Sequence, residues 1–370
     1  MLSVQSQWFS EAPRYAPRMD PVLPAPLVPG DVVGVTSPSS GVPESLHPRL
    51  EIALDAVRAA GFEIELGTCM DGSGIVSASA ADRADEFQRM LLDPSIRAVV
   101  PPWGGELAID LLDRLDWSAI ADAEPTWVVG FSDMSTLLTP LTLLTGWATV
   151  HGQNLLETPC VPPAGLRSWI DIVTEPRGSK VVQTSPGAYR ATFVDWVDHP
   201  GTAEYVLDTP CSWVRLDGLG GDLDIGGRLL GGCLETLSPL AGTRYLDPAR
   251  LDPTGDGLIL YLDIADADAG ATCRALHGMR LNGLFDDARA VLISRTDAPP
   301  LDSFTQHDAV VDALSRLEIP LLADLECGHV APYLPLVNGA LARIEHSPAL
   351  SRVTQTLGGG PAYSSDPDAR

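Results

Sequence analysis

In the N-terminal half of the chain, short apolar runs alternate with longer segments in which apolar residues recur at helical spacing. The apolar runs, which indicate buried strands, lie at 31–36, 62–66, 98–100 and 126–130. The segments with helical spacing lie at 44–60, 81–92, 106–115 and 134–144. Strands that alternate with helices predict a doubly wound parallel α/β sheet, in which ligands bind at the carboxyl ends of the strands.

The C-terminal half repeats this alternation after a weaker stretch. Between 160 and 227 we expect a linker and long loops, with one strand at 180–184. For 228–243 we expect a strand, a Gly-Gly turn and a helix, and for 257–264 an apolar strand that ends in an acid. Further strands are expected at 290–294, 320–324 and 327–339, and helices at 270–284 and 304–317. A chain of 370 residues is long enough for two domains with separate cores.

Composition and charge narrow the function classes. The chain is 45% hydrophobic and 20% charged, as in an ordinary soluble globular protein, and its formal charge of −25 argues against a nucleic-acid-binding surface. Because residues 1–28 lack an apolar signal region and no run reaches the ~20 residues of a membrane span, we expect a cytoplasmic protein without membrane contact. The six cysteines form no C-x-x-C pair, so we expect free thiols and no zinc site. We predict no other metal and no cofactor.

One serine in the N-terminal pattern is placed for nucleophilic attack. The apolar run at 126–129 reaches Gly130, and Ser132 and Asp133 then precede the helical segment 134–144. A turn from strand to helix lifts a hydroxyl off the end of the sheet and points the N–H groups of the helix start at the group it attacks. We therefore interpret Ser132 as a nucleophile.

A serine nucleophile needs a base, and that base needs an acid to orient it. Of the seven histidines, only His151 and His329 follow a predicted strand and lie beside a glycine. His329, on a turn after a buried strand, is the better candidate for the base. The other five are His47, His199, His277, His307 and His346. Spacing leaves four candidates for the acid, which are Glu235, Asp263, Asp324 and Glu326.

The oxyanion that forms during attack needs backbone N–H donors. The candidates are the N–H of Asp133, which follows the nucleophile, and those of Gly104 and Gly105, which lie at the end of a neighbouring strand. Asp263, Asp266 and Asp268 lack the glycine and glutamate pattern of a calcium loop, which supports the prediction of no metal.

Several longer stretches resemble one family, the serine peptidases that include the LD-carboxypeptidases of murein recycling and the microcin C resistance proteins. The matching stretches are PGDVVGVTSPSS near the start, 82–112, VVGFSDMSTLL (128–138), WATVHGQNL (147–155), RLLGGCLETLSPLAGT (228–243), GLILYLDIADA (257–267) and 327–344. They follow the family order over most of residues 28–345.

The resemblance implies a Ser–acid–His triad of Ser132, Asp263 and His329. The family's acid is a glutamate, so Asp263 shortens that side chain by one methylene, and Glu235 stays open as an assisting acid. The implied fold is a parallel-sheet nucleophile domain followed by a smaller β-rich α/β domain, usually in a homodimer. We divide the chain into a lead-in (1–27), a nucleophile domain (28–160), a linker with substrate-covering loops (161–227), a C-terminal domain (228–350) and a tail (351–370).

The resemblance also implies a substrate with an amide bond, either a murein tetrapeptide or a peptidyl nucleotide of microcin type. Long covering loops are typical of the microcin branch, so Trp196 or Trp213 would stack on a base, unless both only pack the loop onto its own domain. We also assign Trp103 and Glu235 to substrate binding. Two other functions stay open, an α/β-hydrolase esterase and a non-catalytic binding protein. The esterase turn requires glycine two residues after the serine, where this chain has Met134.

Overall fold

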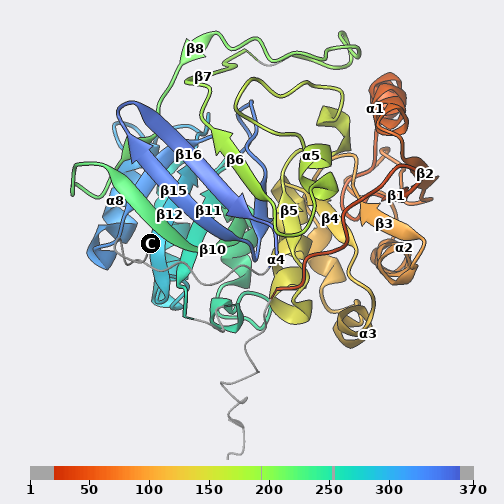
Figure 1. Ribbon diagram of the computed structural model, residues 1–370, viewed down its shortest axis with the longest axis horizontal. Helices are drawn as coiled ribbons and strands as arrows, with labels where there is room; N and C mark the ends of the chain where they lie inside the picture. Colours follow the sequence, from red (N-terminus) through yellow and green to blue (C-terminus); the bar gives the residue numbers. More distant parts are fainter. Residues whose placement is uncertain (1–20, 193, 252–254, 359–370) are drawn as a thin grey trace, which may run out of the picture.

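The computed structural model describes residues 21–192, 194–251 and 255–358 (Figure 1). Within them the chain forms two large sheets that lie side by side, one mainly from the N-terminal half and one from the C-terminal half. The predicted α/β fold, with a parallel N-terminal sheet and a β-rich C-terminal region, is confirmed. Residues 1–20 of the predicted lead-in and 359–370 of the predicted tail lie outside the described residues.

The N-terminal sheet has the strand order β14-β5-β4-β3-β1-β2. Its strands are β1 (Val32–Val35), β2 (Glu63–Leu66), β3 (Ile96–Val99), β4 (Trp127–Gly130), β5 (Thr149–His151) and β14 (Leu336–Asn338). The first five are parallel, whereas β14 comes from the C-terminal half and pairs antiparallel with β5. The helices of this half are α1 (His47–Ala59), α2 (Ala80–Leu92), α3 (Trp117–Asp122) and α4 (Ser135–Thr145).

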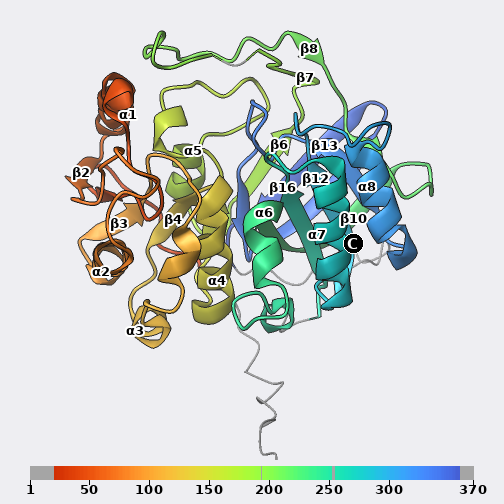
Figure 2. The ribbon, with the colours of Figure 1, turned by 180° about the vertical axis from the view of Figure 1, so that it is seen from behind.

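The C-terminal sheet has eight strands in the order β6-β16-β15-β10-β11-β12-β13-β9. Its parallel centre consists of β10 (Leu223–Cys233), β11 (Leu258–Asp263), β12 (Ala288–Ser294) and β13 (Leu321–Leu325). Antiparallel strands flank this centre, namely β6 (Lys180–Thr184), β9 (Val214–Arg215), β15 (Leu341–Ser347) and β16 (Leu350–Thr356). The helices of this half are α6 (Leu234–Leu237), α7 (Ala269–Leu281) and α8 (Gln306–Leu314), and Figure 2 shows them on the same side of the sheet.

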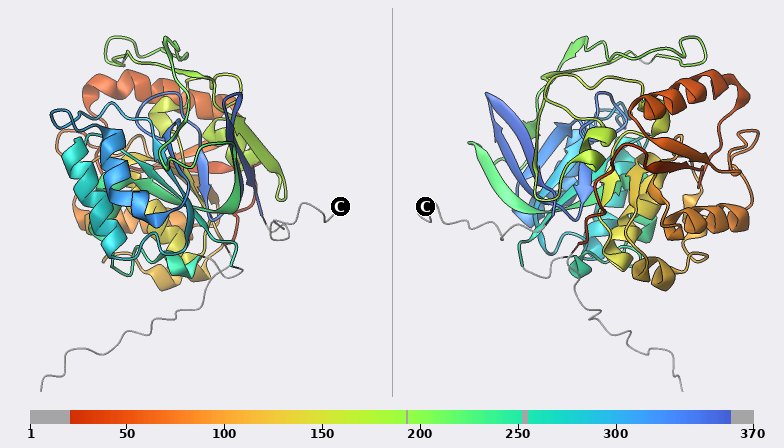
Figure 3. Two further views of the ribbon diagram at one scale, coloured as in Figure 1. Left: turned by 90° about the vertical axis from the view of Figure 1, so that its left-hand side faces the viewer. Right: turned by 45° about the vertical axis from the view of Figure 1, so that its right-hand side comes forward.

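The segment expected to hold covering loops contains α5 (Trp169–Thr174), β6, and the short pair β7 (Ala188–Tyr189) and β8 (Thr209–Pro210). Its chain around 190–210 extends from the C-terminal half across to α1 (Figures 1 and 3). It is fixed there by Arg49 of α1, whose Nη1 donates to the carbonyl oxygens of Pro200 and Thr202 at 2.8 and 2.6 Å. The segment therefore connects the two halves of the molecule.

Three local predictions are wrong. Residues 106–115 form only a short 3₁₀ turn, Ala108–Leu111, and the N–H of Ala108 at its start donates to the side chain of Asp133. The Gly231-Gly232 pair is not a turn, since β10 runs through both. A Cβ on Gly231 would lie 1.9 Å from the carbonyl oxygen of Tyr261, so Gly231 permits close pairing of β10 with β11. The loop expected at 217–227 is likewise strand from Leu223 on.

Other expectations concern the thiols and the membrane. All six cysteines are free, as predicted. None of the helices in the described part of the chain is long and apolar enough to cross a membrane.

Polar contacts fix the two sheets to each other at their buried boundary. The backbone N–H of Cys233, at the end of β10, donates to Ser135 Oγ at the start of α4 at 2.9 Å. The amide of Asn338 on β14 accepts from the N–H of Gly231 at 2.9 Å and from the hydroxyl of Tyr261 at 2.7 Å. These bonds hold the carboxyl ends of β10 and β11 beside the start of α4.

Glu326, directly after β13, supports a stability prediction. It is fully buried and accepts from Arg295 Nη2 at 3.1 Å, Trp213 Nε1 at 2.8 Å and Ser185 Oγ at 2.5 Å. Glu326→Ala leaves the buried guanidinium without its carboxylate and should reduce the free energy of unfolding by about 3–5 kcal/mol. Arg352→Ala, which breaks the partly exposed pair with Glu345, should cost about 0–1 kcal/mol. Urea unfolding measures both, and equal losses would contradict the role given to Glu326.

Candidate functional site

The turn after β4 presents Ser132 in a strained backbone conformation. Ser132 has a φ of +61°, in the left-handed region that non-glycine residues rarely adopt. The preceding N–H, of Phe131, donates to Asn154 Oδ1 at 3.2 Å. A Cβ on Gly130 would lie 2.8 Å from the same oxygen, so glycine is needed there. The surrounding contacts thus hold the serine in a conformation associated with functional turns.

The side chain of Asp133 joins three segments around the serine. It is buried and accepts from Ser39 Oγ at 2.5 Å, the N–H of Ala108 at 2.8 Å and Thr136 Oγ1 at 3.2 Å. Ser39 lies in the loop after β1, and Ala108 follows the glycine pair 104–105. The carboxylate therefore fixes the glycine loop relative to the start of α4.

A small open space lies beside Ser132 because residue 104 is glycine. A Cβ built on Gly104 would stand 3.0 Å from Ser132 Oγ and 3.1 Å from the backbone nitrogen of Asp133. Among the described residues, the N–H groups of Gly104, Gly105 and Asp133 donate to no protein acceptor. The space is therefore bordered by the serine hydroxyl and by a backbone donor that has no partner, as an oxyanion site requires.

His329 and Asp263 form a close pair at the end of the C-terminal sheet. His329 Nδ1 lies 3.0 Å from Oδ1 and 2.9 Å from Oδ2 of Asp263. Asp263, the last residue of β11, is fully buried, whereas the His329 side chain is 28% exposed. A Cβ on Gly328 would lie 2.3 Å from Asp263 Oδ1, so the glycine leaves room for the carboxylate. The imidazole is thus anchored at Nδ1 and reaches solvent.

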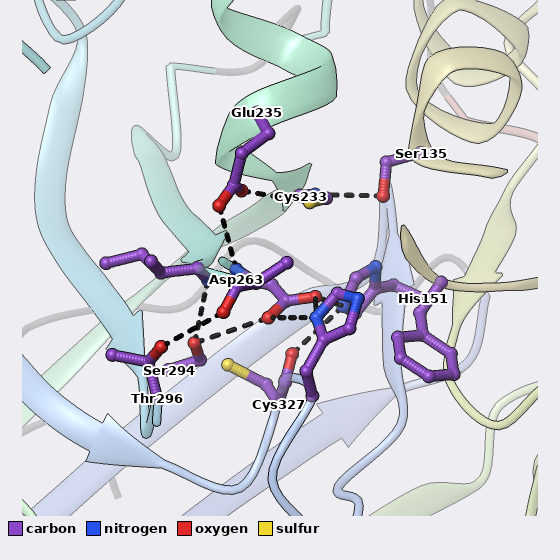
Figure 4. A network of polar contacts seen from close by, with 12 residues as sticks. Ser135, His151, Cys233, Glu235, Asp263, Ser294, Thr296 and Cys327 are labelled. Atoms are coloured by element: carbon purple, nitrogen blue, oxygen red, sulfur yellow. Dashed lines mark hydrogen bonds and ion pairs between the residues drawn. The ribbon is translucent and has the colours of Figure 1, made fainter. Parts of the chain in front are cut away.

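Two neighbours complete the surroundings of Asp263 (Figure 4). Ser294 Oγ donates to its Oδ1 at 3.4 Å and accepts from the N–H of Ile264 at 2.9 Å. His151 Nε2 lies 4.0 Å from Oδ2 and donates to the carbonyl oxygen of Cys327 at 3.0 Å. Burial lowers the pKa of His151 despite the nearby charge of Asp263, so this imidazole is neutral.

The charge of Asp263 controls the protonation of His329. Burial disfavours the imidazolium, but the negative charge of Asp263 and its hydrogen bond to Nδ1 outweigh this effect and raise the pKa of His329 above its ordinary value. The charges of Glu235 and Asp266 act in the same direction. His329 therefore accepts a proton more readily than an isolated histidine.

The other three candidate acids have different partners. Glu235 Oε1 accepts the N–H groups of Ala265, Asp266 and Ala267 at 3.0, 3.1 and 2.9 Å, and its Oε2 accepts from Cys233 Sγ (Figure 4). Glu235 therefore fixes the loop that follows β11. Asp324 pairs with His307, and Glu326 pairs with Arg295. Of the four, Asp263 is the acid that contacts the His329 ring.

One cleft of about 510 Å³ brings the predicted site residues together. Its lining includes Ser132, His329, Gly104, Gly105, Trp103 and Glu235. Trp103 is anchored by its Nε1, which donates to the carbonyl oxygen of Gly41 at 2.9 Å. The nucleophile, the base and the glycine pair thus face the same space although they come from different sheets.

Two predicted substrate-binding tryptophans do not line this cleft. Trp213 is buried in the core of the C-terminal sheet, because its indole N–H is satisfied there by Glu326 Oε2. Trp196 lies under the guanidinium of Arg49, 4.6 Å from the ring centroid. Trp213 therefore packs within the C-terminal half, as the alternative expected, whereas Trp196 packs against α1 of the N-terminal half.

Sequence reasoning missed several residues that support the site. Ser39 and Asn154 hold the nucleophile turn, and Ser294 contacts the acid. The Ser-Pro-Ser-Ser run after the first strand was a usable signal for Ser39, since strand ends carry ligand-site residues. Among the described residues, a cluster of metal-ligand types, Cys273, His277 and Asp312, lies on α7 and α8 outside the cleft.

Both halves of the chain are similar to known proteins. A family model for the LD-carboxypeptidase N-terminal domain matches residues 33–152, and one for the LD-carboxypeptidase C-terminal domain matches residues 226–344. The microcin C7 self-immunity protein MccF of Escherichia coli is 25% identical over 332 residues, which are 88% of this chain and 93% of that protein.

Solved structures show the same fold. MccF in complex with aspartyl sulfamoyl adenosine superposes with a TM-score of 0.77 at 23% identity, over 91% of this chain and 98% of that one. An MccF-like protein from Bacillus anthracis superposes with a TM-score of 0.76 at 20% identity, over 91% and 99% of the two chains.

The pair of His329 and Asp263 gives a titration prediction. In Asp263→Asn the carboxylate charge is lost while the burial of the ring remains, so the pKa of His329 should fall from its raised value. Histidine ring signals followed by NMR across pH 4 to 9, about the span in which histidine titrates, measure the midpoint. His307, whose raised pKa depends on Asp324, serves as the internal control and should not move. An unchanged or higher midpoint for His329 would contradict the assigned electrostatics.

Proposed function

The chain belongs to the LD-carboxypeptidase family of serine peptidases, and we propose that it hydrolyses an amide bond through Ser132, His329 and Asp263. The observation that carries this proposal is the shared cleft, in which a strained serine, a solvent-reaching imidazole and an open backbone donor meet. The peptidase activity class follows from the family, whereas the triad and its order of events are our proposal.

In the proposed acylation step, His329 takes the proton from Ser132 Oγ as this oxygen attacks the amide carbonyl. The negative charge that develops on the carbonyl oxygen is stabilised by the N–H of Asp133 and by an N–H of the glycine pair 104–105. The C–N bond then breaks, and the imidazolium of His329 returns its proton to the leaving nitrogen. An acyl ester on Ser132 remains.

In the proposed deacylation step, His329 deprotonates a water molecule as this attacks the ester carbonyl. The ester C–O bond then breaks, the imidazolium returns the proton to Ser132 Oγ, and the acid leaves. Asp263 does not exchange protons in either step. It accepts from Nδ1–H, so Nε2 is left as the basic nitrogen, and its charge stabilises the imidazolium. The distances of 2.9 and 3.0 Å between His329 Nδ1 and the Asp263 carboxylate support the proposal that an aspartate can orient the base at the position where the family has a glutamate.

Two substrate classes fit the family, a short peptide such as a murein tetrapeptide and a peptidyl or aminoacyl nucleotide. Solved relatives include MccF with aspartyl sulfamoyl adenosine, MccF with glutamyl sulfamoyl guanosine and an MccF-like protein from Streptococcus pneumoniae with AMP. These complexes support a peptidyl nucleotide as substrate, although Trp196 and Trp213 do not offer the stacking surface expected for its base.

The alternatives have less support. An α/β-hydrolase esterase does not fit a chain in which both family domains match. A non-catalytic binding protein was suggested by the aspartate at the acid position, and the close contact of that residue with His329 favours catalysis instead. A homodimer stays a prediction from the resemblance, and a cytoplasmic location stays a prediction from the sequence.

Ser132→Ala is the direct test of the proposed function. Removing the nucleophile should lower kcat/KM by at least about 10³-fold. The assay should compare a murein tetrapeptide with an aminoacyl sulfamoyl nucleotide, side by side. Ser45→Ala, at an exposed serine outside the cleft, is the matched control and should keep full activity. If Ser132→Ala hydrolyses a substrate at the wild-type rate, the proposed role of Ser132 is contradicted. If the wild type hydrolyses neither substrate, the enzyme acts on a different amide.

A further inference from the structure

Glu157 is a buried carboxylate at the cleft that the proposed reaction does not use. It ends the 3₁₀ turn Leu155–Glu157, shortly after β5, and it lines the same cleft as Ser132 and His329. Its side chain is only 8% exposed, and its Oε2 has no hydrogen-bond partner. Leaving a buried polar group without a partner is costly, and a charged one more so.

Nearby cations do not satisfy this carboxylate. Arg49 directs its donors at the carbonyl oxygens of Leu156, Pro200 and Thr202 and at Cys160 Sγ. Arg190 lies over the ring of Tyr205 instead, 5.5 Å from its centroid. Neither arginine forms an ion pair with Glu157 within the part of the chain that the structure describes.

The pKa of Glu157 reflects this position. Burial raises it to about 7, against the opposing charges of Arg49 and His329. A positive charge placed against this carboxylate would offset the cost of its burial.

The rest of the cleft lining is acidic as well. Glu106, Glu235 and Asp266 also face this space, and no lysine or arginine occurs among its described lining residues. Apart from His329, the titratable groups of the lining named here are acidic, and a cleft lined mainly by one sign of charge concentrates ligands of the opposite sign. A substrate carboxylate at this position would meet repulsion, and a neutral group would leave Glu157 without a partner.

We propose that Glu157 binds a positively charged group of the substrate, an ammonium or a guanidinium, within the catalytic cleft. This subsite deepens the proposed hydrolase function and rests on it for the identification of the cleft. The cation donates to the Glu157 carboxylate on the side that lines the cleft and forms a charge-assisted hydrogen bond. Substrates with a basic side chain or a free amine near the scissile bond would therefore be preferred over acidic ones.

The test measures binding separately from catalysis. The Ser132→Ala protein is titrated calorimetrically with three capped amino acids, Nα-acetyl-lysine methylamide, its norleucine analogue and its glutamate analogue. The lysine probe should bind about tenfold more tightly than the norleucine probe, as one charge-assisted contact allows. The glutamate probe should bind most weakly.

Two further variants, made in the same background, assign the effect. Glu157→Gln keeps the size of the side chain and should remove the preference for lysine. Glu51→Gln makes the same charge change on the exposed surface of α1 and should leave the preference for the lysine probe unchanged. The proposal is overturned if the lysine probe binds no more tightly than the norleucine probe, whether both bind or neither does.

The comparison within the Ser132→Ala protein needs no Glu157 variant, so misfolding of Glu157→Gln cannot hide the result. Failure of the subsite also differs from failure of the proposed function. If Ser132→Ala discriminates between the probes but the wild type hydrolyses no amide, the proposed subsite is supported and the proposed hydrolase function is contradicted. If the wild type hydrolyses an amide but Ser132→Ala does not discriminate between the probes, the hydrolase function is supported and the subsite is contradicted.

Discussion

The hydrogen bond between His329 Nδ1 and the carboxylate of Asp263 is the interaction on which the site depends. Asp263 is fully buried at the end of an apolar strand, where an ionised carboxylate is stable only with a charged or hydrogen-bonding partner. The contact fixes which imidazole nitrogen carries the proton and raises the pKa of the ring. Gly328 makes it possible, since a Cβ there would collide with the carboxylate.

The fold serves to bring this pair to a serine on a different sheet. Ser132 follows β4 in the N-terminal sheet, whereas Asp263 ends β11 in the C-terminal sheet. Their relative position is set by buried bonds between Ser135 and Cys233 and around Asn338. Because these bonds are shielded from water, the two halves of the site are held by contacts that solvent does not compete for.

The parts of this arrangement that depend on local pattern could be predicted from the sequence. An apolar run that ends in Gly130 before a helical segment predicts a turn at Ser132, and an acid at the end of an apolar strand predicts a partner for Asp263. Contacts between distant residues could not be predicted in this way. The 3₁₀ turn found where a helix was expected at 106–115 is tied by the N–H of Ala108 to Asp133, which is 25 residues away along the chain. Trp213 is held by Glu326, which is 113 residues away along the chain.

In the proposed mechanism, Ser132 becomes acylated during turnover, with His329 as its base. Rapid-quench mass spectrometry on the wild-type protein, with whichever amide substrate it hydrolyses, tests this claim most directly. We expect a transient mass increase, equal to the acyl group of the substrate, on the peptide that contains Ser132. Turnover with no adduct on that peptide, or an adduct on Cys233 in the same cleft, would contradict it.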